Sequence, residues 1–292
     1  MWLVVSLLAF VLGVAIPMKG VPEGRRTAVA LLTYAGVAGT LLEGQVNGVF
    51  LLAFSVAFMQ LLSGRCLLGG LFLGVLWLKP QYAVVFPLVF VAKGRWRELL
   101  GMSITGLLIG LGSLAMIGPT GVVQYLSAIG QVGGYYASVG SLASPEAMAN
   151  WRALLLHLLP GLPEQSGLLL TWGLGGATLL LSLLVWRGPW EARSPRFPLQ
   201  LLVTMAAALI ASPHSHLHGT VLLLAPVAFI VARPEKLIVS TGLLHLLLAT
   251  GYSLALVAWV FRGVSWLFVP YLLAVAWMLA RAIHSAEPQV CT

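Results

Sequence analysis

The sequence predicts an all-α fold, a polytopic bundle of membrane helices. Hydrophobic residues make up 60% of the 292 residues and charged residues only 8%, whereas soluble domains carry about 25% charged residues. The apolar residues form long runs with short polar segments between them. The net charge of +8 comes from Lys and Arg in a few of these segments, as in cytoplasmic loops. We therefore expect membrane lipids as partners and no nucleic acid.

Residues 1–292 are expected to form a single transmembrane domain. A span needs about 20 apolar residues to cross the hydrocarbon core of the bilayer, and several runs lie near the lower limit. The first run lacks the basic start and the cleavage site of a signal peptide, and it is short enough for the chain to look truncated. The predicted spans are residues 2–17, 27–43, 46–63, 99–117, 166–186, 197–212, 217–232, 237–260 and 264–282.

The basic residues predict the orientation, because Lys and Arg are enriched in cytoplasmic loops. The spans alternate if the segment 66–92 begins and ends inside. Three polar clusters then lie on the extracytoplasmic face of the plasma (inner) membrane: EGQVN (43–47), Lys79 with Pro80, and SPHSHLHG (212–219). The residues placed inside are Lys19, Arg25, Arg26, Arg65, Lys93, Arg95, Arg97, Arg187, Arg193, Arg196, Arg233, Lys236 and Arg281.

The segment 66–92 is predicted to be a broken helical hairpin. It is too short for two full spans, and Lys79 and Pro80 interrupt it near its middle. Proline lacks an N–H group and disfavours helix at the residue before it. Two half-helices with Lys79 and Pro80 at the tip satisfy the charge pattern. The alternative is one long tilted helix, kinked at the proline, with Lys79 reaching towards the surface.

Residues 118–165 are expected to form an extracytoplasmic loop. Its first half, 125–140, is Gly-rich and expected to be mobile, whereas 149–161 predicts an amphipathic helix at the interface that starts with Trp151 and Arg152. Its aromatic residues would contact lipid or sugar, or only anchor the loop. The two cysteines, Cys66 and Cys291, are far apart in sequence and are expected to be free thiols.

The segment SPHSHLHG is predicted to open a helix, with Ser212 as N-cap and Pro213 in the first turn. Helix N-termini favour anions such as phosphate. His214 and His218 would then share one face, and His216 would point elsewhere. Zinc is the weaker hypothesis, because this spacing separates the histidines and no Cys or Asp is near. The histidines could also be interfacial decoration, so we predict no metal site.

Seven residues are the candidate site residues. An intramembrane lysine marks a functional site, whereas Gln45 and Asn47 could also serve only to bond helices to each other. The candidates for substrate binding are Gln45, Asn47, Lys79, His214 and His218, and the candidates for catalysis are Glu43 and His216.

Three stretches resemble glycosyltransferase family 87: EGQVNGVFLLAF (43–54), GGLFLGVLWLKPQYAVVFPLVFVAKGRWRELLG (69–101) and IGPTGVVQYLSAI (117–129). The resemblance covers roughly residues 25–230. It implies a GT-C membrane glycosyltransferase that moves a hexose, with mannose expected first, from a polyprenyl-phosphate carrier to a lipid or glycan acceptor of the cell envelope. It implies no cofactor.

The family's catalytic base, an Asp in the first external loop, has no counterpart, because all eight acidic residues are Glu. The resemblance thus implies that the family's N-terminal part is missing. Glu43 or the neutral His216 is the substitute base, and we expect the chain to lack transferase activity. Two alternatives remain. A secondary transporter would explain the broken helices, although no repeat is visible, and a non-catalytic membrane subunit would explain the missing Asp.

Overall fold

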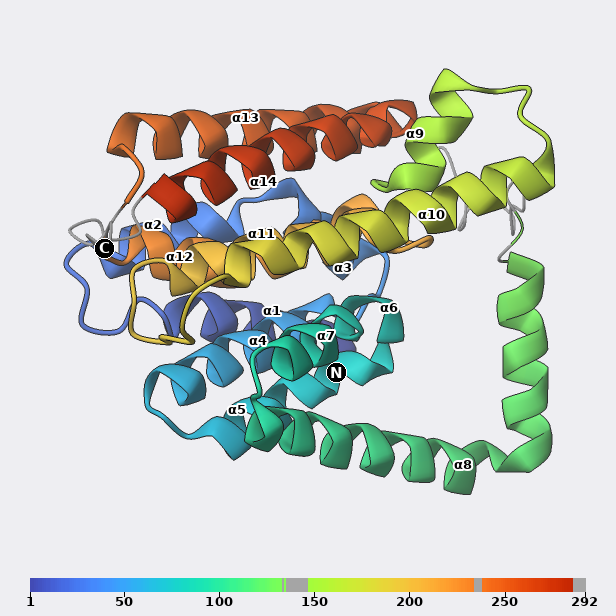
Figure 1. Cartoon of the computed structure of the whole chain (residues 1–292), viewed down its shortest axis with the longest axis horizontal. Helices are drawn as coiled ribbons and strands as arrows, with labels where there is room; N and C mark the ends of the chain where they lie inside the picture. Colours follow the sequence, from blue (N-terminus) through green and yellow to red (C-terminus); the bar gives the residue numbers. More distant parts are fainter. Residues whose placement is uncertain (133, 135–146, 234–237, 286–292) are drawn as a thin grey trace.

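The computed structural model describes residues 1–132, 134, 147–233 and 238–285, and these are arranged as a helical bundle without β-strands (Figure 1). The predicted all-α class is confirmed. Within the described ranges, short 3₁₀ helices extend or begin longer helices: η1 (Gly74–Leu78), η4 (Leu183–Trp186), η5 (Leu217–Leu223) and η7 (Arg262–Leu267). The α-helices are α1 (Trp2–Ala15), α2 (Gly24–Leu32), α3 (Ala35–Leu42), α4 (Asn47–Leu62), α5 (Cys66–Leu73), α6 (Pro80–Ala83), α7 (Val85–Ala92), α8 (Trp96–Val132), α9 (Trp151–Leu158), α10 (Glu164–Ser182), α11 (Phe197–Ala211), α12 (Leu224–Val231), α13 (Thr241–Val260) and α14 (Phe268–Ser285).

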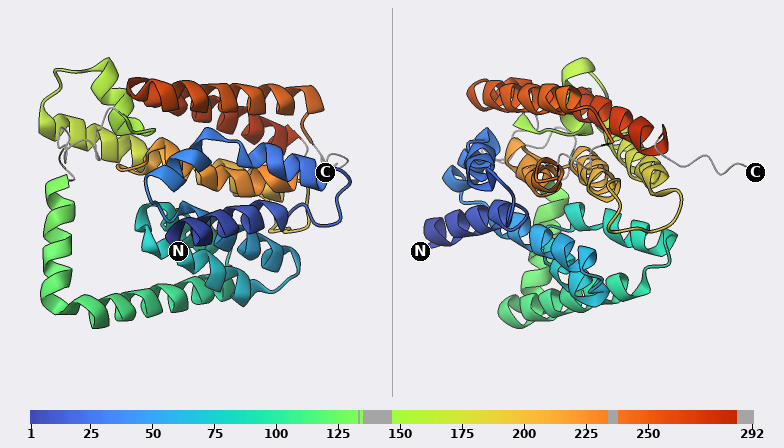
Figure 2. Two further views of the ribbon diagram at one scale, coloured as in Figure 1. Left: turned by 180° about the vertical axis from the view of Figure 1, so that it is seen from behind. Right: turned by 90° about the vertical axis from the view of Figure 1, so that its left-hand side faces the viewer.

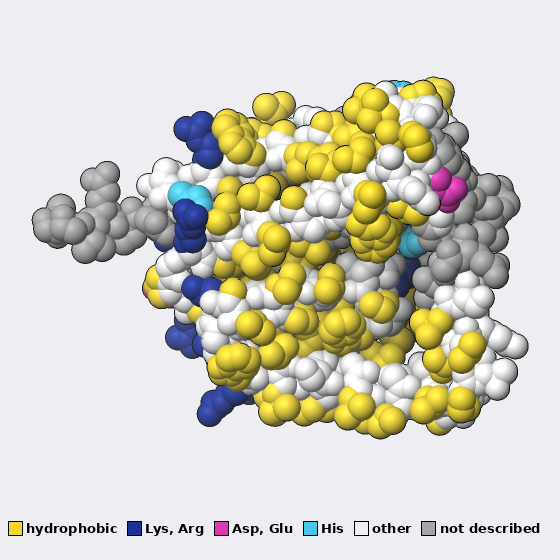
Figure 3. Space-filling model, turned by 45° about the vertical axis from the view of Figure 1, so that its right-hand side comes forward, with side chains coloured by type: hydrophobic (Ala, Val, Ile, Leu, Met, Phe, Trp, Pro, Cys, Tyr) yellow, Lys and Arg dark blue, Asp and Glu magenta, His cyan; other side chains and the backbone are white. Residues whose placement is uncertain are grey.

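The flanks of the bundle are suited to lipid. Large apolar side chains such as Leu107, Leu180 and Leu246 are exposed along the helices. Figure 3 shows hydrophobic side chains over the flank, and Lys and Arg side chains gathered at one end. By length and composition, four helices of the described part can cross a membrane, and the other apolar helices have 10–17 residues. These four are residues 96–128, 164–186, 241–260 and 263–285. The number of spans stays a prediction.

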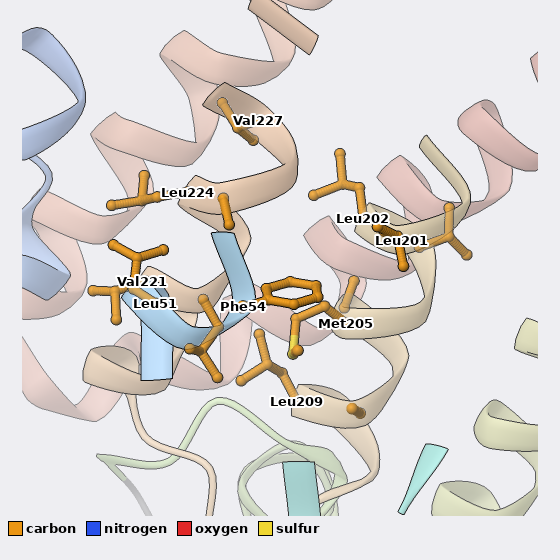
Figure 4. Packing of buried hydrophobic residues seen from close by; sticks show 14 of the residues in the cluster. Leu51, Phe54, Leu201, Leu202, Met205, Leu209, Val221, Leu224 and Val227 are labelled. Atoms are coloured by element: carbon orange, nitrogen blue, oxygen red, sulfur yellow. The ribbon is translucent and has the colours of Figure 1, made fainter. Parts of the chain in front are cut away.

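The core lies around α11 and α12, between the N-terminal helices and the pair α13 and α14 (Figures 1 and 2). Nearly every residue of α11 is buried. Phe54 of α4 lies beside Met205 of α11 in this core, and Leu51 lies beside Val221 of η5 (Figure 4). Because α11 is surrounded by protein, a helix of only 15 residues can lie at the centre of the bundle.

The predicted hairpin is confirmed. Helix α5 and η1 lead away from the basic end of the bundle, the chain turns at Lys79, and α6 and α7 lead back. The two ends meet, because Arg95 Nη2 donates a hydrogen bond to Cys66 Sγ at 3.1 Å. Each arm, 66–78 or 80–92, has 13 residues and rises about 20 Å, less than the roughly 30 Å of a bilayer core. Cys66 is a free thiol, as predicted, and Cys291 lies outside the described residues.

Glycines bring the first arm of the hairpin against α8. A Cβ atom on Gly70 would overlap the backbone of Glu98, and one on Gly101 would overlap the backbone of Leu67. Small residues of this kind let membrane helices approach closely. We expect Gly70→Ala to lower the free energy of unfolding by about 1–3 kcal/mol, the usual cost of overpacking. Thermal unfolding of the purified protein measures this. Gly110→Ala on α8 is the control, because its Cβ would meet no atom within 4 Å, and an equal loss there would contradict the packing explanation.

The prediction of a loop over 118–165 is wrong in its first part. Helix α8 bends at Gly118, whose φ of 67° is left-handed, and a second helical section continues along one end of the bundle as far as Val132 (Figure 1). Glycine adopts this conformation without a Cβ penalty, and Pro119 suits the start of a new helical section. Of the segment 125–140, expected to be mobile, 125–132 are helical and 135–140 lie outside the described residues.

The helix predicted in 149–161 is confirmed as α9, and Asn150 caps it by accepting a hydrogen bond from Ala153 N on Oδ1 at 3.0 Å. Its first side chains face protein. The Trp151 indole donates to Thr178 Oγ1 of α10 at 2.9 Å, and Arg152 is buried. Contacts with protein, rather than with lipid or sugar, therefore hold the start of α9 in place.

Candidate active site

Three segments that are distant in sequence meet around the ammonium group of Lys79. Lys79 lies at the turn of the hairpin and is half-buried. Its Nζ donates to Gln45 Oε1 at 2.8 Å and to Asn47 Oδ1 at 3.2 Å. Both acceptors are neutral amide oxygens at the start of α4. The two hydrogen bonds hold the positive charge in place, and the nearby carboxylate of Glu43 attracts it.

Asn47 ties the third segment to this pair. Its side chain is fully buried, and its Nδ2 donates to the backbone oxygen of His218 at 3.0 Å. Thr40 Oγ1 approaches the same oxygen at 3.4 Å. Because Asn47 uses both ends of its amide on protein groups, it is a positioning residue that fixes Lys79 relative to the histidines. One role considered for Asn47 from the sequence was only to form hydrogen bonds between helices, and the structure contains such a bond. A direct contact of Asn47 with the substrate stays a prediction.

A second polar contact of this region joins the side chains of Glu43 and His218. The distance from Glu43 Oε2 to His218 Nδ1 is 2.7 Å, although the angles are not those of a hydrogen bond. The Glu43 side chain is 36% exposed and that of His218 8%. A carboxylate beside an imidazole, with one partly open to the surface, is an arrangement that can accept a proton from a bound hydroxyl.

The histidines of the loop 212–216 are held neutral. Burial, followed by the charge of the neighbouring His218, lowers the pKa of His216 to about 4. The His216 and His218 rings are stacked with centroids 5.4 Å apart. Burial, followed by the charge of Arg152, also lowers the pKa of His214. Near neutral pH, His214 and His216 therefore add hydrogen-bonding groups to the site but little positive charge, and His216 is a weak base.

The predicted helix start at Ser212 and Pro213 is wrong. Ser212 ends α11, and the next helix begins at Leu217 as a 3₁₀ helix with His216 as its N-cap. His214 lies in the intervening turn and shares no helical face with His218. With only four residues in α6 and seven in η5, helix dipoles give little support for anion binding. That support now rests on Lys79.

The reason for this difference is a tertiary contact that the sequence did not reveal. Ala149 N donates to Ser215 O at 2.7 Å, and Asn150 Nδ2 donates to Ser212 O at 2.8 Å. These bonds hold 212–216 in a non-helical conformation. Asn150 precedes an apolar run, which is a recognisable N-cap signal, but no sequence signal pairs it with a segment about sixty positions later.

The fold and this site define a helical membrane protein with a polar site at one end of the bundle. Figure 3 shows acidic and histidine side chains at the end opposite the gathered Lys and Arg side chains. Among the described residues, no group of three or more His, Cys, Asp or Glu is arranged to hold a metal ion.

The chain belongs to glycosyltransferase family 87, whose family model matches residues 1–213. The resemblance seen in the sequence is thus confirmed, although the match begins at residue 1 rather than near residue 25. It covers Glu43, Gln45, Asn47 and Lys79 and ends before the histidines. Comparison with curated proteins and with solved structures gave no significant match. Membership of this family makes the protein a membrane glycosyltransferase.

Proposed function

We propose that the protein transfers a hexose, with mannose as the first candidate, from a polyprenyl-phosphate carrier to a lipid or glycan acceptor on the extracytoplasmic face. The observation that carries this proposal is the Lys79 ammonium group, held by two neutral amides at the tip of a broken hairpin. A fixed positive charge there would bind the carrier phosphate. It would also stabilise the negative charge that develops on the phosphate as the sugar leaves.

The acceptor is activated by Glu43 in this reaction. Glu43 takes the proton of the acceptor hydroxyl, whose oxygen forms a bond to the anomeric carbon of the sugar. The bond from that carbon to the phosphate oxygen breaks, and its electron pair leaves with the carrier phosphate beside Lys79. The contact of 2.7 Å between Glu43 and His218 supports Glu43 in the role for which the sequence offered no Asp. His216 is the weaker candidate for this role, because its own burial, followed by the charge of His218, lowers its pKa to about 4.

A transfer assay tests this function. Purified protein in lipid nanodiscs would be given polyprenyl-phosphate-mannose and a lipid extract as acceptor, and the release of polyprenyl phosphate would be measured. The proposal expects release that depends on the acceptor. If no hexose carrier led to release, the proposed transfer would be contradicted. That result would agree with the expectation, drawn from the sequence, that the chain is inactive, and with the alternative of a non-catalytic subunit.

The proposed sidedness gives a separate prediction. Glu164 at the start of α10 and Arg193 before α11 lie at opposite ends of the bundle. In a protein without Cys66 and Cys291, a cysteine at position 164 should react with an impermeant thiol reagent added outside intact cells. A cysteine at 193 should react only after the membrane is opened. Labelling of position 193 from outside would contradict the extracytoplasmic placement of the site.

A further inference from the structure

An apolar groove lies between α10, α11 and α14, away from the site around Lys79. Its volume is about 590 Å³. Leu181 and Val185 line one side, Ala207 and Ile210 the base, and Leu273 and Ala280 the other side. Leu181 is 63% exposed and Trp277 of the same groove 60%. The groove is therefore open along the flank of the bundle, where a bilayer supplies hydrocarbon chains.

One end of this groove is basic. Arg281 and His284 line it together with Trp277, and positions 277, 281 and 284 share one face of α14. The Arg281 guanidinium lies 5.0 Å from the centroid of the Trp277 ring. No Asp or Glu lines the groove, and neither Arg281 nor His284 has an acidic partner within the described residues. Both lie near the end of α14, at the end of the bundle where Lys and Arg gather.

The length of the groove matches one leaflet. From Leu273 to His284, α14 rises about 16 Å, close to half of the roughly 30 Å hydrocarbon core. Trp151 of α9, which lies towards the opposite end of the molecule (Figure 1), lines the far end of the groove, where its indole donates to Thr178 at 2.9 Å. An acyl chain of a phospholipid fits this depth, whereas a long polyprenyl chain exceeds it.

We propose that this groove binds one phospholipid with an anionic head group, taken from the leaflet at the basic end. The acyl chain lies along Leu181 and Ala207, and Arg281 and His284 bind the head-group phosphate. Arginine binds phosphate with paired N–H groups, and a tryptophan beside it suits the interface between head groups and hydrocarbon. This site is separate from the proposed carrier site, which lies around Lys79 at the other end of the bundle.

Native mass spectrometry of the purified protein tests the head-group contact. Phosphatidylglycerol and phosphatidylcholine with identical acyl chains would be added to the protein in detergent. We expect the wild type to bind phosphatidylglycerol about tenfold more tightly. The substitution Arg281→Gln should remove this preference, because it should weaken binding of the anionic phosphatidylglycerol more than that of the zwitterionic phosphatidylcholine. Arg25→Gln is the matched control, because Arg25 is exposed at the same end of the bundle but lies outside the groove, and it should keep the preference.

A second pair of variants tests the acyl-chain contact. Ala177 is exposed and lines the groove, whereas Ala274 is exposed on α14 and does not. Ala177→Phe should fill the groove and lower binding of both lipids about tenfold, and Ala274→Phe should not. Size-exclusion chromatography and thermal unfolding would establish that each variant is folded. Equal binding of the two lipids by the wild type, equal losses in Arg281→Gln and Arg25→Gln, or normal binding by Ala177→Phe would each overturn the proposal.

Discussion

Replacing Lys79 with methionine is expected to weaken the binding of polyprenyl phosphate by about one to two decades, the equivalent of roughly 1.5–3 kcal/mol for a charge-assisted contact. Methionine keeps the apolar stem but removes the ammonium group that Gln45 and Asn47 hold. Neither His214 nor His216 replaces that charge, because burial lowers the pKa of both. Binding would be measured with purified protein in lipid nanodiscs, with folding checked by chromatography.

The histidines and a distant lysine supply the controls for this measurement. His214→Ala and His218→Ala should each cost less than Lys79→Met, since a neutral hydrogen bond contributes about 0.5–1.5 kcal/mol. Lys93→Met removes a partly exposed lysine at the other end of the same hairpin and should leave binding unchanged. Equal binding by wild type, Lys79→Met, His214→Ala and His218→Ala would show that these residues serve helix packing rather than a phosphate.

The second large effect is expected for Glu43→Gln, which should slow sugar transfer by about 10²–10⁴-fold, the usual contribution of a general base. Glutamine preserves the shape of the side chain but accepts no proton. The carrier phosphate is bound by Lys79 in this proposal, so binding of polyprenyl phosphate should change little. Single-turnover transfer in nanodiscs, measured beside carrier binding, separates the two steps.

Glu164→Gln is the matched control for Glu43, because Glu164 is an exposed acid at the start of α10 and lies outside the contacts around Lys79. Its rate should equal that of the wild type. His218→Ala should lower the rate less than Glu43→Gln, since His218 acts by positioning the carboxylate at 2.7 Å. A Glu43→Gln protein that transfers sugar at the wild-type rate would remove Glu43 from the mechanism.

The hairpin at Lys79 and the placement of the three polar segments at one end of the bundle could be predicted from the sequence, because both follow from the distribution of charge. The spacing of Arg65, Lys79 and Lys93 in a run too short for two spans predicted the hairpin. The same alternation predicted that EGQVN, Lys79 and the histidines lie together at one end. The structure joins them through the hydrogen bonds of Lys79 and Asn47.

The parts that depend on tertiary hydrogen bonds could not be predicted. Local propensity favoured a helix from Pro213, but bonds from Ala149 and Asn150 hold that segment outside a helix. Periodicity also gave no sign that α8 would resume after Gly118, since Gly followed by Pro usually marks a loop. A tertiary hydrogen bond determines the local structure at 212–216, and a single backbone angle determines it at Gly118. The hydrophobic pattern of the sequence contains no information about either.

The central claim is that the site around Lys79 holds the phosphate of a lipid carrier. Its most direct test compares the binding of polyprenyl phosphate with that of the uncharged polyprenol of the same length, by wild-type protein in nanodiscs of neutral lipid. The proposal predicts that the phosphate binds at least about tenfold more tightly, as expected for one charge-assisted contact. Equal affinity for the phosphate and the alcohol would contradict it.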